Sequence, residues 1–308
     1  MINTVTLINR FLKSDAETFI KECENEYHNE MQNIAKLIAE SKHLRIVMLA
    51  GPSGAGKTTT AHILRSYLTE LGVSTQVVSL DHFYRDRDTL PVINGKIDAE
   101  SVDALNLAEI KDCFGKIIAT GKCYIPNFDF KNAKSIKNAE LIDISKGGVM
   151  IVEGLHALNP AITSNLPKDS LYKVYISVNS PIKSGVGTEL LSSRRIRLMR
   201  RAIRDERTRG ADIFATLKMW SQVVAGEEKY LYPFKDTADK MLVTLHPYEP
   251  CVYKQKFLAL MKGVDKSAEN YEYAKSVVDA LQFFDYLDEE LIPYDSLIRE
   301  FIGNGKFS

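Results

Sequence analysis

The sequence predicts an α/β fold: a doubly wound parallel sheet with helices on both faces. Three largely apolar runs, residues 44–50, 149–154 and 171–178, are short enough to be strands. Apolar runs of this kind are typical of strands that are buried on both faces, as in parallel sheets. Stretches with helical spacing separate them, and this alternation is typical of the doubly wound class.

The remaining elements are predicted from spacing and turn residues. Residues 14–41 are predicted to be a helix, because Ser14 and Glu17 form a capping box and apolar side chains then recur at helical spacing. Further along we expect a helix at 57–71, a strand at 76–80, a helix at 107–119 and a hairpin at 122–144, around the polar turn KNAKS. The end of the chain, residues 269–302, is predicted to be mostly helical.

Composition places the chain among ordinary globular proteins. Of its 308 residues, 45% are hydrophobic, so a sizeable core is possible. The 40 basic and 40 acidic residues cancel, which argues against nucleic-acid binding by the chain as a whole. No apolar run approaches the ~18 residues of a membrane span, the N-terminus lacks a signal-peptide pattern, and the four cysteines form no CxxC pair. We therefore predict a cytoplasmic protein with no membrane or nucleic-acid partner.

Residues 51–58, GPSGAGKT, follow the first apolar run and fit the pattern GxxxxGK[ST]. Glycines let backbone N–H groups surround phosphate oxygens, and the following helix presents its positive end to them. The lysine can reach the β and γ phosphates, and the threonine can hold Mg²⁺. The alternative is a glycine-rich turn without a ligand. The pattern favours a P-loop that binds a nucleoside triphosphate through Gly51, Ser53, Gly54, Ala55, Gly56, Lys57, Thr58 and Thr59.

Residues 149–160, VMIVEGLHALNP, place an acidic residue at the end of a predicted buried strand. A P-loop protein needs a carboxylate there, near the Mg²⁺ that the loop holds. We expect Glu153 to take this place, and the alternative is an ordinary solvated glutamate. His156 either contacts substrate or caps a helix, and the sequence does not decide between the two.

Residues 79–86, SLDHFYRD, place Asp81 at the end of another strand. In a doubly wound sheet, ligands bind beyond the carboxyl ends of the strands, so Asp81 should face the γ-phosphate. An aspartate there can orient an acceptor hydroxyl and take its proton. The alternative is a helix or turn cap. Phe83 and Tyr84 beside it are either walls of a small-molecule pocket or core residues.

An arginine-rich stretch lies at residues 194–212. Four of its arginines recur at i, i+3, i+4 and i+7, on one face of a helix: Arg197, Arg200, Arg201 and Arg204. Arginine neutralises phosphoryl charge bidentately, so we expect a mobile lid that closes over the phosphates and excludes water. The alternatives are a solvated charged helix and a nucleic-acid-binding helix, although the latter lacks interleaved aromatic residues.

Together these stretches resemble the uridine kinase and phosphoribulokinase family. The resemblance rests on GPSGAGKT, SLDHFYRD, PNFDF at 126–130, VEGLHALNP and RRAIRDERTRG at 200–210, in this order, and covers residues 44–239. The later KYLYPFKDTAD and IPYDSLIREFIG are similar to a bacterial branch of uridine-kinase-like proteins. Members of that branch often carry an N-terminal TGS domain, whereas here only a predicted helix precedes the P-loop.

The resemblance implies a nucleoside kinase that uses ATP and Mg²⁺ to form a 5′-monophosphate. It implies that Asp81 is the catalytic base, that Lys57 and Arg204 are also catalytic, and that Thr58 and Glu153 hold Mg²⁺.

The same resemblance implies further contacts on both sides of the site. Arg209 would join Arg204 as a lid arginine, and Arg200 would be a further contact to the nucleotide. The walls of the acceptor pocket would be Tyr84, Phe128 and Phe130.

The chain departs from the family pattern at two places. Well-matched uridine kinases carry an Asp-His-Pro-Asp stretch whose acidic residue holds the ribose. This chain reads KIDAESVDAL at 96–105, so either Asp98 or Glu100 takes that role. Those kinases also carry a histidine soon after the aromatic pair, where this chain has Ala133 or Lys134. The base, or the acceptor itself, can therefore differ.

We expect three parts: an N-terminal helical extension at 1–43, a P-loop kinase domain at 44–264 and a C-terminal helical tail at 265–308. The kinase domain would contain an acceptor lobe at 122–145 and an arginine lid at 194–212. The predicted function is ATP- and Mg²⁺-dependent phosphorylation of a small-molecule hydroxyl, with uridine or cytidine first. The alternatives are another acceptor, such as a sugar phosphate or pantothenate, and a nucleotide-binding regulator or RNA-associated NTPase. The apolar helices at both ends either pack on the core or form a homo-oligomer.

Overall fold

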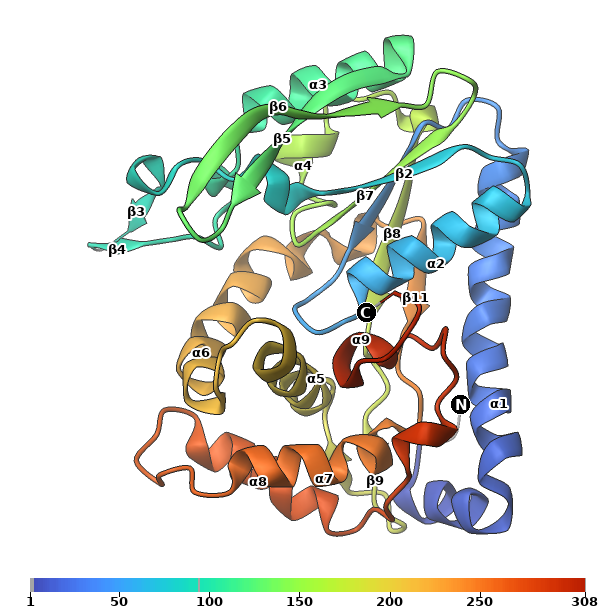
Figure 1. Ribbon diagram of the computed structural model, residues 1–308, viewed down its shortest axis with the longest axis vertical. Helices are drawn as coiled ribbons and strands as arrows, with labels where there is room; N and C mark the ends of the chain where they lie inside the picture. Colours follow the sequence, from blue (N-terminus) through green and yellow to red (C-terminus); the bar gives the residue numbers. More distant parts are fainter. Residues whose placement is uncertain (1–2, 94, 308) are drawn as a thin grey trace.

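The computed structural model describes residues 3–93 and 95–307 and confirms the α/β fold. A five-stranded sheet forms its centre, in the order β11-β8-β1-β7-β2, and every neighbouring pair is parallel (Figure 1). The strands are β1 (Ile46–Ala50), β2 (Thr75–Ser79), β7 (Val149–Gly154), β8 (Leu171–Ser177) and β11 (Lys240–Val243).

Alternate side chains of the central strands enter two separate apolar cores. In β1, Val47 and Leu49 belong to one core, whereas Ile46, Met48 and Ala50 belong to the other. Every residue of β1 and β7 is buried. Because successive side chains of a strand point to opposite faces and both faces are covered, these strands need apolar residues throughout. This explains the uninterrupted apolar runs of the sequence.

Helices cover both faces of the sheet (Figure 1). The longer helices are α1 (Val5–Glu40), α2 (Lys57–Glu70), α3 (Leu107–Thr120), α5 (Ser193–Thr208), α6 (Ile213–Tyr230), α7 (Glu249–Met261) and α8 (Tyr271–Leu281). The single-turn helices are α4 (Pro160–Thr163) and α9 (Arg299–Ile302). Two short antiparallel pairs join β3 (Val92–Ile93) to β4 (Lys96–Ile97) and β9 (Ile182–Lys183) to β10 (Glu189–Leu191). None of the helices in the described ranges is long and apolar enough to cross a lipid bilayer.

The N-terminal helix differs from the prediction at its start. It begins at Val5 and bends at Asp15, where the backbone leaves the helical conformation. Asp15 Oδ1 accepts a hydrogen bond from the Thr18 N–H at 3.0 Å, so Asp15 caps the segment that follows the bend. The capping box predicted at Ser14 is therefore wrong by one residue, because the Ser14 hydroxyl donates to the Phe11 carbonyl oxygen at 3.0 Å and Asp15 accepts from the helix instead.

The hairpin predicted at 122–144 is present as β5 (Lys122–Asp129) and β6 (Lys134–Asp143). Its register is interrupted between Ile125 and Asn127. Pro126 lies at this point and has no N–H to donate to the ladder, which accounts for the irregularity. The far end of the hairpin carries Phe128 toward Tyr84, and the two ring centroids are 5.6 Å apart.

The end of the chain is less helical than predicted. Beyond residue 265 the described α-helices are α8 and the single turn α9, and most of the chain between them is irregular. Leu297, Ile298 and Phe301 are nevertheless fully buried. They belong to the same core as α1 and one face of β1, so their apolar spacing reflects packing rather than a long helix. We call residues 293–307 the C-terminal segment.

Candidate active site

The P-loop lies between β1 and α2, at the carboxyl end of the sheet. β1 ends at Ala50 and α2 begins at Lys57. Gly56 has φ +85°, a conformation that glycine adopts without strain. A Cβ atom on Gly54 would lie 2.9 Å from the backbone oxygen of Arg197, so a side chain at this position would collide with α5. The glycine pattern therefore reflects both a sharp turn and a close approach.

Side chains from α5 and α6 hold the outer side of the P-loop. Glu227 accepts a hydrogen bond from the Ser53 N–H at 2.8 Å, and Arg197 donates to the Ser53 carbonyl oxygen at 3.0 Å. Arg197 and Glu227 are themselves a buried ion pair, with an N–O distance of 2.6 Å. Arg201 donates to the Ser53 hydroxyl at 2.8 Å. These contacts hold the P-loop in one conformation before any ligand binds. Little reorganisation is then needed when the loop binds negatively charged phosphates.

A cavity of about 720 Å³ opens over the P-loop, and we call it the main cavity. Its volume lies in the range of small-molecule sites. The P-loop residues that line it are Ser53, Gly54, Gly56, Lys57 and Thr58. The other three residues predicted to bind the nucleotide are buried and do not line the cavity: Gly51, Ala55 and Thr59.

Asp81, Thr58 and Glu153 meet at the carboxyl ends of β2 and β7. Ser79 of β2 pairs with Glu153 of β7, and Asp81 follows two residues later. Thr58 Oγ1 lies 3.5 Å from Glu153 Oε1, and all three side chains line the main cavity. Burial raises the pKa of Glu153 and the pKa of Asp81, and the charge of Lys57 opposes both shifts. The side chain of Asp81 is exposed to the cavity, while the protein atoms that surround the cavity wall cause the desolvation that raises its pKa.

The residues present fit a nucleotide with bound Mg²⁺. Mg²⁺ takes oxygen ligands and usually only one or two from protein, and the Thr58 hydroxyl and the Glu153 carboxylate supply such oxygens. Five cationic side chains line the same cavity and can neutralise phosphate charge: Lys57, Arg87, Arg201, Arg204 and Arg209.

The arginine-rich helix is packed into the core over much of its length, which does not support the expected mobile lid. Arg197 and Arg200 are 1% and 0% exposed, whereas the prediction placed the arginines on a closing surface. Arg200 forms a bidentate ion pair with Glu249 of α7, with N–O distances of 2.5 and 2.7 Å. It also donates to the Gly54 carbonyl oxygen at 3.1 Å, from behind the P-loop. Arg200 does not line the main cavity, so its position does not support the expected contact with the nucleotide.

The remaining arginines share one buried carboxylate. Asp205 accepts two hydrogen bonds from Arg204, at 3.0 and 2.8 Å. Its oxygens also lie 3.2 Å from Arg201 Nε and 3.5 Å from Arg209 Nε. Asp205 is 3% exposed and therefore offsets the repulsion among three guanidinium groups that all face the cavity.

An aromatic cluster forms another part of the cavity wall. The rings of Tyr84, Phe128 and Phe130 have centroids 5.0 to 6.4 Å apart and pack at steep angles. Phe130 remains 66% exposed, so the cluster is open on one side. A flat ring can pack against such a surface.

Glu100, rather than Asp98, faces the main cavity. Asp98 Oδ2 accepts a hydrogen bond from the Tyr230 hydroxyl at 2.7 Å and lies 3.7 Å from Lys229 Nζ. Burial raises the pKa of Glu100, and the charge of Arg201 opposes the shift. Of the two acids that the sequence left open, the geometry therefore favours Glu100.

His156 is a buried side chain, 4% exposed, and its ring lies 5.7 Å from that of Tyr230. Burial lowers its pKa to about 4, which keeps it neutral at pH 7, and it interacts with the backbone of Glu100. Because His156 does not line the main cavity, its position does not support the expected substrate contact. It packs instead beneath the turn that carries Glu100.

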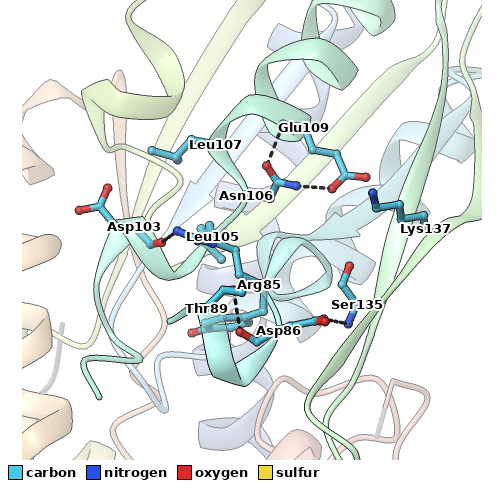
Figure 2. A pocket seen from close by; sticks show the side chains of 11 residues that line it. Arg85, Asp86, Thr89, Asp103, Leu105, Asn106, Leu107, Glu109, Ser135 and Lys137 are labelled. Atoms are coloured by element: carbon cyan, nitrogen blue, oxygen red, sulfur yellow. Dashed lines mark hydrogen bonds between the residues drawn. The ribbon is translucent and has the colours of Figure 1, made fainter. Parts of the chain in front are cut away.

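Tyr84 also lines a second cavity, of about 630 Å³ (Figure 2). Polar side chains around it pair with one another. Asn106 donates to Glu109 at 2.8 Å, and Asp86 accepts from the Ser135 N–H at the same distance. We place the functional site in the main cavity, because that cavity contains the P-loop.

Three glutamates that sequence reasoning missed also touch this region: Glu227, Glu249 and Glu300. One signal was available for Glu227. Trp220, Val223 and Glu227 recur at helical spacing in α6, so a charged residue occupies a core position there. A buried charge needs a partner, and the arginine-rich stretch was the obvious source. Glu249 lies outside the quoted motifs, and Glu300 lies within IPYDSLIREFIG, a stretch that gave no sign of contact with the P-loop.

Comparison with known proteins agrees with this geometry. The family model "Phosphoribulokinase / Uridine kinase family" matches residues 46–246. No curated protein matches the chain. Among solved structures, a provisionally assigned fructose transport system kinase from Silicibacter sp. TM1040 has a TM-score of 0.50, with 18% identity over 68% of this chain and 98% of that chain.

Two further solved structures are more distant. A provisionally assigned uridine kinase from Bacillus stearothermophilus has a TM-score of 0.42 and 19% identity, over 49% of this chain and 80% of that chain. YFH7 from Saccharomyces cerevisiae, a provisionally assigned P-loop containing kinase with a circular permutation, has a TM-score of 0.41 and 14% identity, over 67% and 91%. The family match confirms the resemblance found in the sequence: the chain belongs to the phosphoribulokinase / uridine kinase family of P-loop kinases.

Proposed function

We propose that this protein transfers the γ-phosphoryl group of ATP to a small-molecule hydroxyl, first of all the 5′-hydroxyl of uridine or cytidine. One observation carries the proposal. Lys57 of the P-loop, Asp81 at a strand end and the aromatic Phe128 all line the same cavity. Donor and acceptor can therefore share one space, which phosphoryl transfer requires.

On the nucleotide side, each group has a distinct role. The P-loop backbone and Lys57 bind the phosphates, and Arg204 and Arg209 neutralise charge on the transferred group. Thr58 and Glu153 would hold Mg²⁺, which, when bound, offsets the negative charge of the phosphates. Arg201 keeps its contact with Ser53 and so steadies the loop.

On the acceptor side, Asp81 is the base. It orients the acceptor hydroxyl and takes its proton as the oxygen forms a bond to the γ-phosphorus, while the bond from phosphorus to ADP breaks. Tyr84, Phe128 and Phe130 pack against the base of the acceptor, and Glu100 accepts hydrogen bonds from its ribose hydroxyls.

We expect turnover to fall as the pH drops through the pKa of Asp81. The base must be ionised to accept a proton, and burial raises its pKa above the ordinary 3.8. The acid limb of kcat/KM should therefore lie above pH 3.8. A pH profile of ADP release measures it. A rate that stays level down to that pH would argue against Asp81 as the base.

Glu100→Gln should weaken acceptor binding with little effect on ATP. A hydrogen bond to a charged group contributes about 1.5–3 kcal/mol, so KM for the acceptor should rise roughly 10- to 100-fold. Initial-rate kinetics with each substrate varied in turn give both KM values. Asp98→Asn is the matched control, because Asp98 lies outside the cavity wall. A larger effect from Asp98→Asn than from Glu100→Gln would reverse the assignment.

A second candidate acceptor carries a phosphate group. Arg87 lines the main cavity together with Phe130 and could pair with such a phosphate. The acceptor site also lacks the histidine of well-matched uridine kinases, with Ala133 or Lys134 in its place. Sugar phosphates therefore belong in the first substrate panel.

The panel measures ADP release with ATP and Mg²⁺ in the presence of nucleosides, sugar phosphates, pantothenate and other small alcohols. Stimulation by uridine or cytidine supports the nucleoside assignment. Stimulation by another acceptor alone keeps the kinase and overturns its substrate. If no acceptor stimulates turnover and RNA does, the protein is an RNA-associated NTPase instead.

A further inference from the structure

We propose that Glu300, in the C-terminal segment, is a positioning residue of the nucleotide site that acts through Arg204. The inference rests on the proposed function, in which Arg204 neutralises charge on the phosphoryl group. The C-terminal segment lies outside residues 46–246, which the family model matches.

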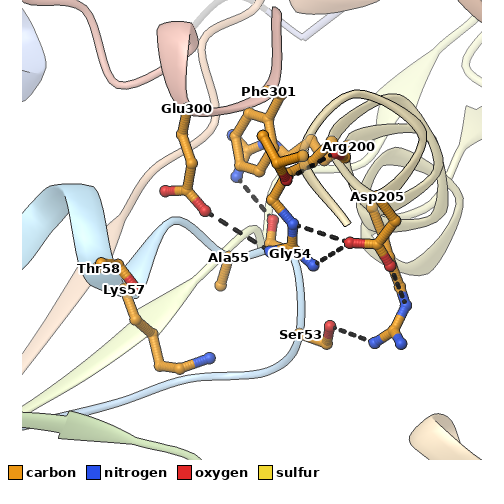
Figure 3. A network of polar contacts seen from close by, with 12 residues as sticks. Ser53, Gly54, Ala55, Lys57, Thr58, Arg200, Asp205, Glu300 and Phe301 are labelled. Atoms are coloured by element: carbon orange, nitrogen blue, oxygen red, sulfur yellow. Dashed lines mark hydrogen bonds and ion pairs between the residues drawn. The ribbon is translucent and has the colours of Figure 1, made fainter. Parts of the chain in front are cut away.

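The C-terminal segment packs directly on the P-loop. A Cβ atom on Gly56 would lie only 3.0 to 3.2 Å from three side-chain carbons of Leu297. Further along, the ring of Phe307 stacks on that of His62 in α2, with centroids 6.3 Å apart. In Figure 3, Glu300 and Phe301 lie beside Gly54 and Ala55 of the loop. The segment therefore forms part of the wall around the phosphate site.

Two arginines of α5, one turn apart, hold Glu300 in place. Arg207 donates to the backbone oxygen of Glu300 at 2.9 Å and fixes the main chain. Arg204 Nη1 lies 3.7 Å from Glu300 Oε1 and faces the carboxylate. The side chains of Arg204 and Glu300 are each only 13% exposed, so water screens this pair weakly. The neighbouring Phe301 is fully buried, and its ring lies 4.9 Å from the Arg200 guanidinium.

A chain of buried polar groups anchors the segment from its other end. Ser296 donates to Glu24 of α1 at 2.5 Å, and Glu24 lies 3.5 Å from His246. His246 in turn lies 3.7 Å from Glu249, the partner of Arg200 behind the P-loop. The segment is thus tied to α1 and, through these charges, to the loop itself. A segment held at both ends can place a carboxylate reproducibly.

Arg204 consequently lies between two carboxylates. These are Asp205 and Glu300, both labelled in Figure 3. Asp205 fixes the Nε and Nη2 side of the guanidinium, which leaves Nη1 to be directed by Glu300. The two carboxylates together fix the orientation of the Arg204 guanidinium. Arg204 and Glu300 both line the main cavity, so this orientation is held at the cavity wall. Catalytic groups lose rate steeply when displaced, about 100-fold for a shift near 1 Å, so this constraint has a consequence for turnover.

Removal of Glu300 should lower turnover without weakening ATP binding, whereas a general structural defect would impair both. Loss of a negative charge beside the phosphates cannot weaken ATP binding electrostatically, whereas a loosened Arg204 stabilises the transition state less well. We therefore expect Glu300→Ala to lower turnover at least tenfold, about the effect of a modest misalignment. The Kd for ATP with Mg²⁺ should be unchanged or tighter. Glu300→Gln, which can still accept from Arg204, should fall between Glu300→Ala and the wild type.

The experiment uses the full chain and two readouts. Titration calorimetry with ATP and Mg²⁺ gives Kd, and ADP release gives turnover, both with and without an acceptor. Basal ADP release needs no acceptor, so the test stands even if the proposed acceptor is wrong. Arg204→Ala and the double variant with both Glu300→Ala and Arg204→Ala complete a double-mutant cycle. If Glu300 acts through Arg204, adding Glu300→Ala to Arg204→Ala should lower turnover little further. Asp295→Asn, an exposed carboxylate in the same segment, is the control.

Four results would overturn the proposal. First, turnover of Glu300→Ala could stay within about twofold of the wild type. Second, its turnover could rise, which would indicate that the C-terminal segment inhibits the enzyme. Binding and turnover could fall together with the melting temperature, which would indicate a structural role alone. The two substitutions could multiply in the cycle, which would show that Glu300 does not act through Arg204.

Discussion

Asp81→Asn is expected to lower turnover by about 100- to 10,000-fold, the usual contribution of a general base. Asparagine keeps the size of the side chain and can still orient a hydroxyl, but it cannot take the proton. ATP binding should survive, since the P-loop and its arginines are untouched. The measurement is kcat from ADP release in the presence of the acceptor, with Kd for ATP from calorimetry on the same preparation.

Asp88→Asn is the matched control for this variant. Asp88 is an exposed residue in the short 3-10 helix Arg87–Thr89 and does not line the main cavity, so its change should leave kcat near that of the wild type. A kcat for Asp81→Asn within about tenfold of the wild type would be too small a loss for a general base. Asp81 would then be at most an orienting group.

The largest expected effect on stability comes from Glu249→Gln, because it leaves the buried Arg200 charge without its partner. Breaking a buried ion pair on one side destabilises proteins by about 3–5 kcal/mol. Burial alone would raise the pKa of Glu249, yet the charges and hydrogen bonds of Arg200 and His246 together outweigh it and lower the pKa to about 2. Urea unfolding followed by circular dichroism measures the change in the free energy of unfolding.

A second variant separates the loss of charge from the loss of packing. Adding Arg200→Met to Glu249→Gln removes the unpaired charge, so the double variant should recover part of the stability. Asp279→Asn, in the exposed pair with Lys275, is the control and should change little. If Glu249→Gln unfolds at the same urea concentration as the wild type, the buried pair does not hold the P-loop in the way described here.

The fold was largely predictable because its signals are local. The strands β1 and β7 are buried on both faces and therefore carry unbroken apolar runs, and GPSGAGKT occupies a turn that needs its glycines. Asp81 and Glu153 were placed together because parallel strands bring their carboxyl ends to one edge.

The rest depended on contacts between distant parts of the chain. The periodicity of Arg197, Arg200, Arg201 and Arg204 is the same whether the helix is exposed or buried, so it gave no warning that Arg200 is fully enclosed. Arg200 can be buried because it forms an ion pair with Glu249, which lies 49 positions away in the sequence. Glu300 was missed for the same reason, since only tertiary packing brings the C-terminal segment to the P-loop.

His156 shows a similar limit. A histidine after a strand end is compatible with substrate contact or with packing, and the sequence left both open. Its ring packs against Tyr230 of α6, a residue from elsewhere in the chain, and burial lowers its pKa to about 4.

The central claim is that one cavity brings the γ-phosphate of ATP to an acceptor hydroxyl at Asp81. The most direct measurement is transfer of ³²P from [γ-³²P]ATP to uridine, compared with 5′-deoxyuridine, which differs only in the reacting hydroxyl. We expect labelled uridine monophosphate from uridine and no labelled nucleotide product from 5′-deoxyuridine. The opposite result would be labelled inorganic phosphate, formed at equal rates with uridine and with 5′-deoxyuridine, and no labelled nucleotide. It would contradict phosphoryl transfer to this acceptor.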